Sequence, residues 1–462
     1  MDSFTFTRRK SSVVQIGAIA IGGNQPIRVQ SMTTTNTNDT EACIEQAKRI
    51  IDAGGELVRL TTQGRREAEN LKQISAGLRA QGYLTPLVAD VHFNANVADI
   101  AAQYVEKVRI NPGNYVDPAR TFKQLEYTDE EYAEELRKID KRLMPFIAIC
   151  KEHHTAVRIG VNHGSLSDRI MSRYGDTPEG IVESCLEFLR IFKRENFNNV
   201  VISIKASNTV VMVQSVRLLV TRMSEEGMCY PLHLGVTEAG EGEDGRIKSA
   251  VGIGALLTEG IGDTIRVSLS EEPEEEIPVA LKLVDSIEEC SRLRMEANKT
   301  ISDDTVTISL HETNWESLQL KAAMAVGALF IDQCAHKLII HNDGFSNDKL
   351  TELSDAILQA ARIKFTKTEY ISCPGCGRTL YDLRSTIARI KEATKDLVGL
   401  KIGIMGCIVN GPGEMADADY GYVGAGPGKI SLYRKKECIE KNIPEDEAVE
   451  HLLAIIQADK GA

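Results

Sequence analysis

Residues 27–269 alternate short β-rich runs with amphipathic helical stretches, and this alternation limits the possible folds more than any other feature of the chain. Strands that alternate with helices build a parallel sheet with the helices outside it. Eight runs have strand character, at residues 27–31, 57–60, 86–90, 107–111, 157–161, 200–205, 232–236 and 264–269. Eight such units predict an α/β fold of the (β/α)8 or TIM-barrel type. A doubly wound open sheet competes, but it normally carries a glycine-rich phosphate turn after an early strand, and the sequence has none in that context.

Two further parts follow the predicted barrel. Residues 271–276 form an acidic run, which is typical of a solvated helix start or linker. Residues 285–367 have a strand-helix-strand-helix pattern of their own, and residues 368–462 mix α and β and contain four of the ten cysteines. We therefore expect a barrel domain at residues 1–284, a short α/β middle segment at 285–367 and an α+β domain at 368–462.

Charge and composition exclude several classes of partner. The formal net charge of −12 argues against nucleic acid or an anionic membrane surface as a partner. No apolar run approaches membrane-spanning length, and residues 1–10 are polar and lack the apolar core of a signal peptide. Ten cysteines in such a chain indicate a reducing compartment and not a disulfide framework. We expect a soluble, cytoplasmic protein.

Five of the eight predicted strands carry a cation among apolar residues, in or near the C-terminal part of the strand, where barrel enzymes build their sites. These cations are Arg59, Arg109, Arg158, Lys205 and Arg266. A buried cation is costly without a partner. A local carboxylate such as Glu56 or Asp263 could pair with one of them, but five equivalent positions favour a shared anionic ligand. Because guanidinium groups match phosphate oxygens bidentately, we predict a phosphorylated, most simply diphosphorylated, small molecule.

Polar residues complete the same rim of the barrel. Asn111 and Ser268 end predicted strands, and Asp90, His92 and Asn162 follow them. Glu238 follows the seventh strand, where a carboxylate near a bound phosphate is a candidate proton donor or acceptor. A salt bridge from Glu238 to one of the arginines is the alternative.

A group of cysteines near the end of the chain predicts a metal site. Cys373 and Cys376 flank Pro374-Gly375, and Cys407 follows an apolar run at residues 402–405. Three thiolates suit an iron–sulfur cluster or zinc. Zinc prefers a closed set of four ligands, and no histidine lies nearby in the sequence. Glu414 could instead supply a labile oxygen ligand that leaves one metal open to substrate, so we favour a catalytic [4Fe-4S] cluster over a structural zinc.

Together these motifs resemble the (E)-4-hydroxy-3-methylbut-2-enyl diphosphate synthase family, the iron–sulfur reductases of the methylerythritol phosphate route to isoprenoids. The resemblance is spread over nearly the whole chain. It covers residues 29–35, 54–64, 86–94, 108–113, 157–166, 202–208, 232–240, 263–269, 373–378 and 406–414.

The resemblance implies a two-electron reductive ring opening of 2-C-methyl-D-erythritol 2,4-cyclodiphosphate with loss of water. Electrons would come singly from reduced ferredoxin or flavodoxin. Cys373, Cys376, Cys407 and Glu414 would ligate a [4Fe-4S] cluster, and Glu238 and Glu414 would be catalytic. The positions that the resemblance assigns to substrate binding are Arg59, Arg109, Asn111, Arg158, Asn162, Lys205, Arg266 and Ser268.

The middle segment departs from the two types of this family. Larger members carry a whole extra domain between the barrel and the cluster domain, whereas roughly eighty residues are too few for a second barrel. The chain is therefore similar to a larger-type member with a shortened middle segment. The sequence leaves open whether the cluster domain closes over its own barrel or over that of a partner in a homodimer. A phosphate- or pterin-binding transferase with a structural metal domain also stays open as an alternative.

Overall fold

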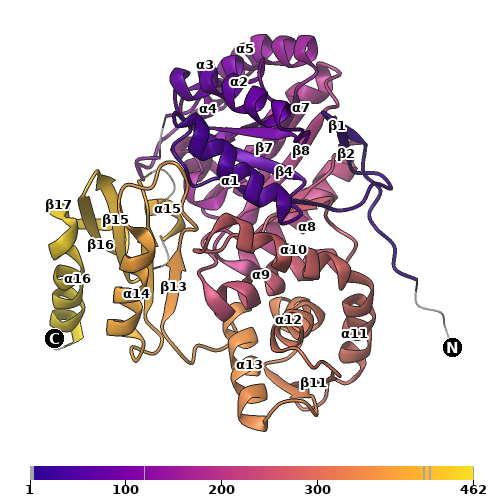
Figure 1. Ribbon diagram of the computed structural model, residues 1–462, viewed down its shortest axis with the longest axis vertical. Helices are drawn as coiled ribbons and strands as arrows, with labels where there is room; N and C mark the ends of the chain where they lie inside the picture. Colours follow the sequence, from indigo (N-terminus) through magenta and orange to yellow (C-terminus); the bar gives the residue numbers. More distant parts are fainter. Residues whose placement is uncertain (1–4, 119, 409–410, 416–417, 461–462) are drawn as a thin grey trace.

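The computed structural model describes residues 5–118, 120–408, 411–415 and 418–460. Residues 409 and 410, which belong to the quoted stretch 406–414, lie outside the described residues. Figure 1 shows a barrel, a mainly helical layer on one side of it and a separate α/β domain that carries the C-terminus.

Eight parallel strands form the barrel, in the order β8-β7-β6-β5-β4-β3-β10-β9. The bridge between Ile202 and Leu232 joins β8 to β9 and closes the ring. The barrel strands are β3 (Arg28–Met32), β4 (Leu57–Thr62), β5 (Leu87–Val91), β6 (Lys107–Ile110), β7 (Ala156–Asn162), β8 (Val200–Lys205), β9 (His233–Leu234) and β10 (Thr264–Ile265). The predicted (β/α)8 barrel is confirmed.

The last two strands are shorter than predicted. β9 and β10 have two residues each, although backbone hydrogen bonding continues beyond them, as from Arg266 N to Leu234 O at 2.9 Å. The helices around the barrel are α1 (Thr40–Asp52), α2 (Arg65–Ala80), α3 (Ala95–Ala101), α4 (Pro112–Tyr115), α5 (Asp129–His153), α6 (Asp168–Tyr174), α7 (Pro178–Arg194), α8 (Thr209–Glu225), α9 (Gly242–Leu257) and α10 (Glu276–Asp285), with 3-10 turns at His163–Ser165 and Pro273–Glu275.

A hairpin that the sequence did not predict closes the floor of the barrel. Its strands are β1 (Val14–Ile16) and β2 (Ile19–Ile21), paired antiparallel. Val14, Ile16 and Ile21 are fully buried against residues of the barrel strands, among them Leu57 and Val201. The apolar side chains of this hairpin therefore seal the N-terminal end of the barrel.

The middle segment packs on the outside of the barrel. Its elements are α11 (Ile287–Lys299), β11 (Thr305–Ser309), α12 (Trp315–Ile331), β12 (Lys337–His341) and α13 (Asn347–Ala360). Helix α12 is apolar and buried along most of its length, and it approaches α9 so closely that a Cβ at Gly254 would lie 2.6 Å from Met324. The buried side chains of the segment are continuous with the barrel core. The segment is therefore a rigid extension of the barrel.

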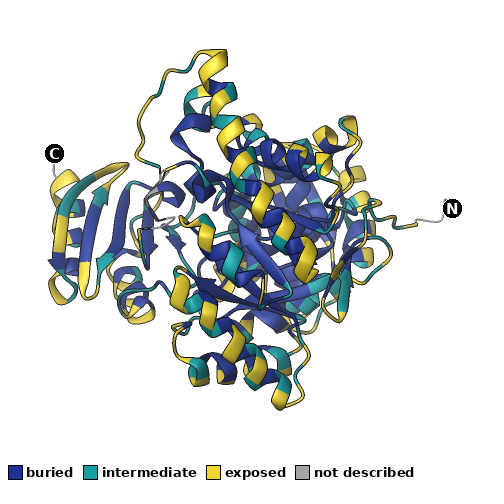
Figure 2. Cartoon of the chain, turned by 90° about the horizontal axis from the view of Figure 1, so that it is seen from above, coloured by how far each residue is buried: buried dark blue, intermediate teal, exposed yellow. Residues whose placement is uncertain are grey.

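The C-terminal domain has a core of its own, around a five-stranded sheet in the order β13-β14-β15-β16-β17. The strands are β13 (Glu369–Ser372), β14 (Lys401–Met405), β15 (Tyr420–Gly426), β16 (Lys429–Arg434) and β17 (Glu437–Pro444), and the helices are α14 (Leu383–Thr394), α15 (Gly411–Glu414) and α16 (Glu445–Lys460). Figure 2 shows the strands of both sheets mostly buried, and the outer faces of the helices exposed. None of the helices described here combines the length and apolar character needed to cross a bilayer.

The C-terminal domain closes over the barrel of its own chain. Ser372 forms a parallel β-bridge with Ala239, which follows β9, and its hydroxyl lies 3.1 Å from that of Ser270. Gly413 approaches Gly164 so closely that a Cβ on Gly413 would lie 1.6 Å from the Gly164 carbonyl oxygen. Only glycine permits such a backbone contact. The rim of the barrel and the cysteine-bearing loops therefore enclose a common space.

Candidate active site

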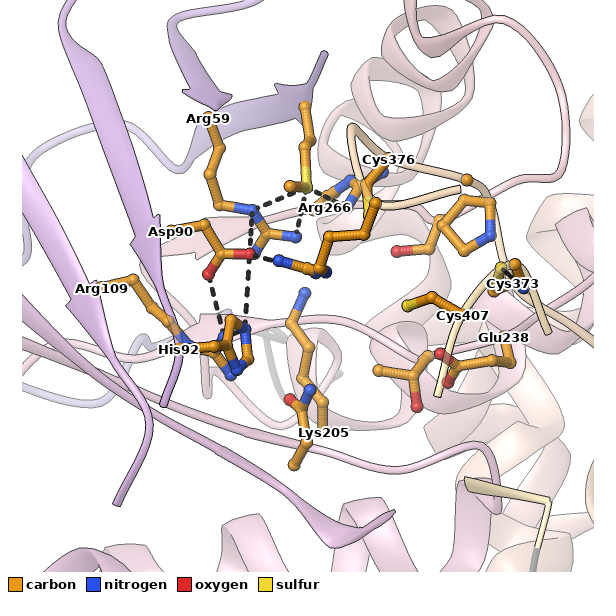
Figure 3. A pocket seen from close by; sticks show the side chains of 18 of the residues that line it. Arg59, Asp90, His92, Arg109, Lys205, Glu238, Arg266, Cys373, Cys376 and Cys407 are labelled. Atoms are coloured by element: carbon orange, nitrogen blue, oxygen red, sulfur yellow. Dashed lines mark hydrogen bonds and ion pairs between the residues drawn. The ribbon is translucent and has the colours of Figure 1, made fainter. Parts of the chain in front are cut away.

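A cavity with about 750 Å³ of empty space lies between the C-terminal ends of the barrel strands and the C-terminal domain. In Figure 3, Arg59, Arg109 and Lys205 reach toward it from the barrel, opposite the three cysteines of the C-terminal domain. The predicted site residues that line the cavity are Arg59, Arg109, Arg158, Asn162, Lys205, Glu238, Arg266, Ser268, Cys373, Cys376 and Cys407. Asn111 and Glu414 were also predicted, and they lie outside this lining.

Asp90 is the carboxylate at the centre of the cationic group. It accepts a hydrogen bond from Arg109 at 2.9 Å, and Arg378 and Arg59 approach it at 3.7 and 4.0 Å. Burial raises the pKa of Asp90, but Arg59 and Arg109 outweigh it and hold that pKa well below its usual range. One negative charge thus faces three guanidinium groups.

Arg158 and Lys205 add charge without adding a carboxylate. Arg158 is only 1% exposed, and its Nε and Nη1 have no hydrogen-bond partner among the described residues. Burial, reinforced by neighbouring cations such as Arg59, lowers the pKa of both side chains well below their ordinary values. Buried donors without a partner are costly, and an anion bound between these side chains would supply the missing acceptors.

Arg266 differs because it has a dedicated partner. Its Nε and Nη2 each donate to a carboxylate oxygen of Glu276 at 2.9 Å. Glu276 also accepts from the Ser31 hydroxyl at 2.7 Å and is 1% exposed, so its placement in a solvated run was wrong. Glu56 and Asp263, the partners considered from the sequence, bind Arg28 and Arg8 instead.

His92 is neutral within this group of cations. It is 4% exposed, and its Nε2 lies 2.5 Å from Nη1 of Arg109. Burial and the charge of Arg109 lower the pKa of His92 to about 3. The ring therefore adds no positive charge near neutral pH, and as a neutral imidazole it can accept the hydrogen bond of Arg109 at Nε2.

Arg378 and Met32 are residues of the site that the sequence analysis missed. Arg378 belongs to the C-terminal domain, lines the cavity and has two buried nitrogens, Nε and Nη1, without a hydrogen-bond partner in the described part of the chain. The signal was its place two residues after Cys376, where a cation stabilises a thiolate. The Met32 sulfur accepts from Nη2 of Arg59 at 2.9 Å, a contact that sequence spacing could not indicate.

The side-chain amide of Asn111 is hydrogen-bonded to two neighbouring loop residues. Its amide nitrogen donates to the Ser165 hydroxyl at 2.8 Å, and its amide oxygen caps α4 by accepting from Gly113 N at 3.1 Å. The side chain is 1% exposed. In this structure Asn111 supports the loop after β6 and does not face the cavity.

Two carboxyl groups meet at the seam between the domains. Glu414 accepts from Thr237 Oγ1 at 3.0 Å and from Gly164 N at 3.3 Å, both in loops of the barrel mouth. Burial and the adjacent Glu238 raise the pKa of Glu414 well above its usual range, and burial also raises the pKa of Glu238. The Oε2 atom of Glu238 has no hydrogen-bond partner among the described residues. The pair can hold a proton beside the cavity.

The three cysteines border one cavity from two loops of the C-terminal domain. Gly406 N donates to the Cys373 sulfur at 3.2 Å, and burial raises the pKa of Cys373 to about 12. Within the described ranges, no three His, Cys, Asp or Glu side chains converge on one point as a single metal ion requires. The predicted fourth ligand, Glu414, is hydrogen-bonded to loops of the barrel mouth and does not line the cavity that the three cysteines border.

The arrangement defines a class: a TIM-barrel enzyme whose strand ends hold cations for an anionic small molecule, covered by a thiol-bearing domain. Residues 11–281 match the family described as GcpE TIM-barrel domain, and residues 369–458 match the GcpE protein C-terminal domain. The chain belongs to the GcpE family.

Curated relatives in this family carry one name, 4-hydroxy-3-methylbut-2-en-1-yl diphosphate synthase (flavodoxin). The protein of Phocaeicola vulgatus is 54% identical over 99% of this chain and 99% of its own length. That of Bacteroides thetaiotaomicron is 52% identical over 100% and 99%, and that of Akkermansia muciniphila 40% over 98% and 97%. The first alignment is 608 positions long, so at least 146 of its positions have no residue in this chain of 462. The relatives give no support to the transferase alternative.

Proposed function

We propose that the chain catalyses the reductive ring opening and dehydration of 2-C-methyl-D-erythritol 2,4-cyclodiphosphate to (E)-4-hydroxy-3-methylbut-2-enyl diphosphate, for isoprenoid precursor biosynthesis in the cytoplasm. The relatives' names support the product. The observation that carries the substrate class is the excess of buried cations at the barrel mouth. Six cations gather there, and among the described residues the carboxylates near them are Asp90, Glu276 and Glu238. The cations are Arg59, Arg109, Arg158, Lys205, Arg266 and Arg378.

In the proposed complex the barrel holds the cyclic diphosphate. Arg158 and Arg378 would donate their unpartnered N–H groups to phosphate oxygens, since charge-assisted hydrogen bonds to phosphate are the strongest these groups make. Arg59, Arg109 and Lys205 would fix the same diphosphate from neighbouring strands, with Asn162 and Ser268 as neutral donors at the rim. Positioning of this kind supplies much of the rate enhancement in a reaction of one bound substrate.

Cys373, Cys376 and Cys407 would hold a [4Fe-4S] cluster, with Glu414 as the proposed fourth ligand. The donor set fits, because each thiolate in such a cluster binds a different iron, and the thiols need to surround a space without converging on one point. When bound, the cluster supplies one-electron transfer and a Lewis-acidic iron beside the substrate.

Glu238 is the proposed proton donor for the loss of water. Burial raises the pKa of Glu238 above its ordinary value, which favours the protonated carboxyl, and the side chain lines the cavity. The leaving hydroxyl needs a proton as its C–O bond breaks. The backbone contacts Ala239–Ser372 and Gly164–Gly413 hold the C-terminal domain against the barrel mouth beside Glu238, and such closure would limit the access of water to this step.

An anaerobic single-turnover assay tests the function. The reconstituted protein is mixed with the cyclodiphosphate, dithionite and a small viologen mediator, and product is measured by phosphorus NMR. We expect product from the parent protein and strong impairment of both Arg59→Ala and Glu414→Ala. A parent protein with an intact cluster that leaves the cyclodiphosphate unchanged would refute the assignment. Flavodoxin is the proposed physiological donor, in line with the relatives' names.

A further inference from the structure

A second groove lies on the outer surface of the seam between the barrel and the C-terminal domain. Phe93, Arg120 and Phe122 line it from the loops of the barrel mouth, and Ile408, Tyr433 and Lys436 line it from the C-terminal domain. We call it the seam groove. Neither the substrate cations nor the three cysteines line the seam groove, although the closure contact between Gly164 and Gly413 lies at its base.

The seam groove gathers exposed apolar side chains. Nine large hydrophobic residues are exposed in the described part of the chain, and three of them line this groove: Phe93 at 46%, Phe122 at 42% and Ile408 at 57%. They include both of the exposed phenylalanines among those nine. Scattered single residues of this kind need no explanation, whereas a contiguous group marks an interaction surface.

Both aromatic residues of the groove have a strained backbone conformation. Phe93 and Phe122 have φ angles of +62° and +60°, a left-handed conformation that bulky residues avoid. The loop around Phe122 is anchored, because Phe122 N and Thr121 N both donate to Asp168, at 3.0 and 2.8 Å. The Arg120 guanidinium lies 4.5 Å from the centre of the Phe122 ring. Strain of this kind persists where the surrounding structure fixes it, most often at functional sites.

The groove is also basic on a strongly acidic protein. Arg120 and Lys436 line it, and Lys123 and Lys435 are exposed beside them in the sequence. In the described part of the chain no carboxylate lines the groove itself. The carboxylates next to Arg120 are Asp176, which is bonded to His163, Asp168, which is bonded to the Phe122 loop, and Glu414. Because the chain carries a net charge of −12, an acidic protein is repelled by most of its surface and attracted at this point.

The position of Ile408 beside the cavity indicates a partner that delivers electrons. Ile408 directly follows Cys407, which lines the catalytic cavity. A protein seated on Ile408 therefore reaches the back of the proposed cluster without entering the substrate cavity. We propose that the seam groove is the docking site of the electron donor, a small acidic flavodoxin that presents the edge of its flavin to the Cys407 loop. This inference rests on the proposed function.

Each docking event would pass one electron. The flavin hydroquinone is oxidised to the semiquinone and the cluster is reduced by one electron, so two successive events supply the pair that the ring opening consumes. Rim cations would speed the encounter, and the apolar residues would hold the complex. The charge attraction and the apolar contacts respond differently to salt. Screening weakens the attraction between charges and leaves apolar contacts in place.

Two groove variants with two matched controls test this docking site. Phe122→Asn removes the ring with a residue that tolerates a positive φ, and Leu84→Asn removes an apolar side chain that is 65% exposed outside the groove. Lys436→Glu reverses a groove charge, and Lys337→Glu reverses an exposed charge on β12. Binding of oxidised flavodoxin to the reconstituted protein is measured by fluorescence anisotropy, and turnover is driven in parallel by reduced flavodoxin or by dithionite with viologen.

We expect both groove variants to bind flavodoxin at least tenfold more weakly, with flavodoxin-driven turnover reduced to match and dithionite-driven turnover unchanged. The Lys436→Glu effect should shrink at high salt, and both controls should behave as the parent. Unchanged flavodoxin binding in both groove variants would overturn the docking site, as would an equal loss of dithionite-driven turnover. A parent that binds flavodoxin at the groove but leaves the cyclodiphosphate unreduced by dithionite would overturn the proposed function and not the docking site.

Discussion

Arg158→Met should make the substrate-free protein more stable, although it removes a residue from the candidate site. The guanidinium is 1% exposed, two of its nitrogens have no hydrogen-bond partner among the described residues, and neighbouring cations such as Arg59 oppose its charge. Each unsatisfied buried donor costs about 1–3 kcal/mol. Removing the donors therefore stabilises the fold, and the imperfect packing of methionine offsets this stabilisation by about 1–2 kcal/mol.

Two such donors cost about 2–6 kcal/mol, so the net gain in the free energy of unfolding is about 1–4 kcal/mol. A unit the size of the barrel has an unfolding entropy of roughly 0.6 kcal/mol/K, so the midpoint of thermal unfolding should rise by about 2–7 °C. The measurement is differential scanning calorimetry of the reconstituted protein with and without the cyclodiphosphate. At a hundredfold excess of ligand over Kd the parent should gain about 2.7 kcal/mol, and the variant should gain much less.

Arg266→Met is the matched control, and its effect should have the opposite sign. Arg266 donates twice to Glu276, which is 1% exposed, so its removal leaves a buried carboxylate without its cation. Breaking such a pair costs about 3–5 kcal/mol. If both variants lower the unfolding midpoint by similar amounts, another interaction offsets the cost of burying the Arg158 guanidinium. That result would refute the reasoning that Arg158 is placed there to bind an anion.

Three further predictions concern protonation, substrate binding and closure. The pKa of His92 lies at about 3, below its ordinary value near 6.5, so the unfolded chain takes up a proton between these values and the folded one does not. Stability should therefore fall as pH drops through this window, by up to about 1.4 kcal/mol per pH unit, and His92→Gln should flatten that slope in denaturant titrations. Arg378→Gln should raise KM for the cyclodiphosphate about tenfold or more, and Arg378→Lys should restore it only in part, because lysine cannot bind bidentately; equal effects of the two would contradict a guanidinium-specific role. Gly413→Ala should place a Cβ against the Gly164 carbonyl and block closure, so that turnover falls at least a hundredfold while calorimetry still detects cyclodiphosphate binding to the barrel.

The barrel could be predicted because its strands are buried on both faces and therefore appear as continuous apolar runs separated by helices. The same pattern cannot reveal the hairpin of β1 and β2 that closes the N-terminal end of the barrel. Strands β1 and β2 have three residues each, too few for any periodicity, and their buried side chains pack against barrel-strand residues such as Leu57. Short elements of this kind depend on tertiary contacts that no local signal encodes.

The ring of cations was predictable for a similar reason, since an arginine in an apolar strand stands out against its neighbours. Its pairing was not predictable. Glu276 belongs to an acidic run that local pattern assigns to solvent, and it becomes a buried partner of Arg266 because α10 begins over the end of β3. Arg378 comes from a different domain and meets Asp90 only after closure. Side-chain partners across distant segments are set by the path of the chain.

That path also favours closure within one chain. Helix α13 ends at the barrel mouth, where the Ala360 carbonyl accepts from Thr209 Oγ1 at the start of α8, at 2.6 Å. Glu369, at the start of β13, is then fixed by Arg362 at 2.8 Å and by Lys248 of α9 at 3.4 Å. Residues 361–368 span at most about 30 Å when fully extended. Because the middle segment shares the core of its own barrel, this short and anchored connection starts the C-terminal domain at the rim it covers. A closure over a partner's barrel would have to break the ion pair between Glu369 and Lys248 first.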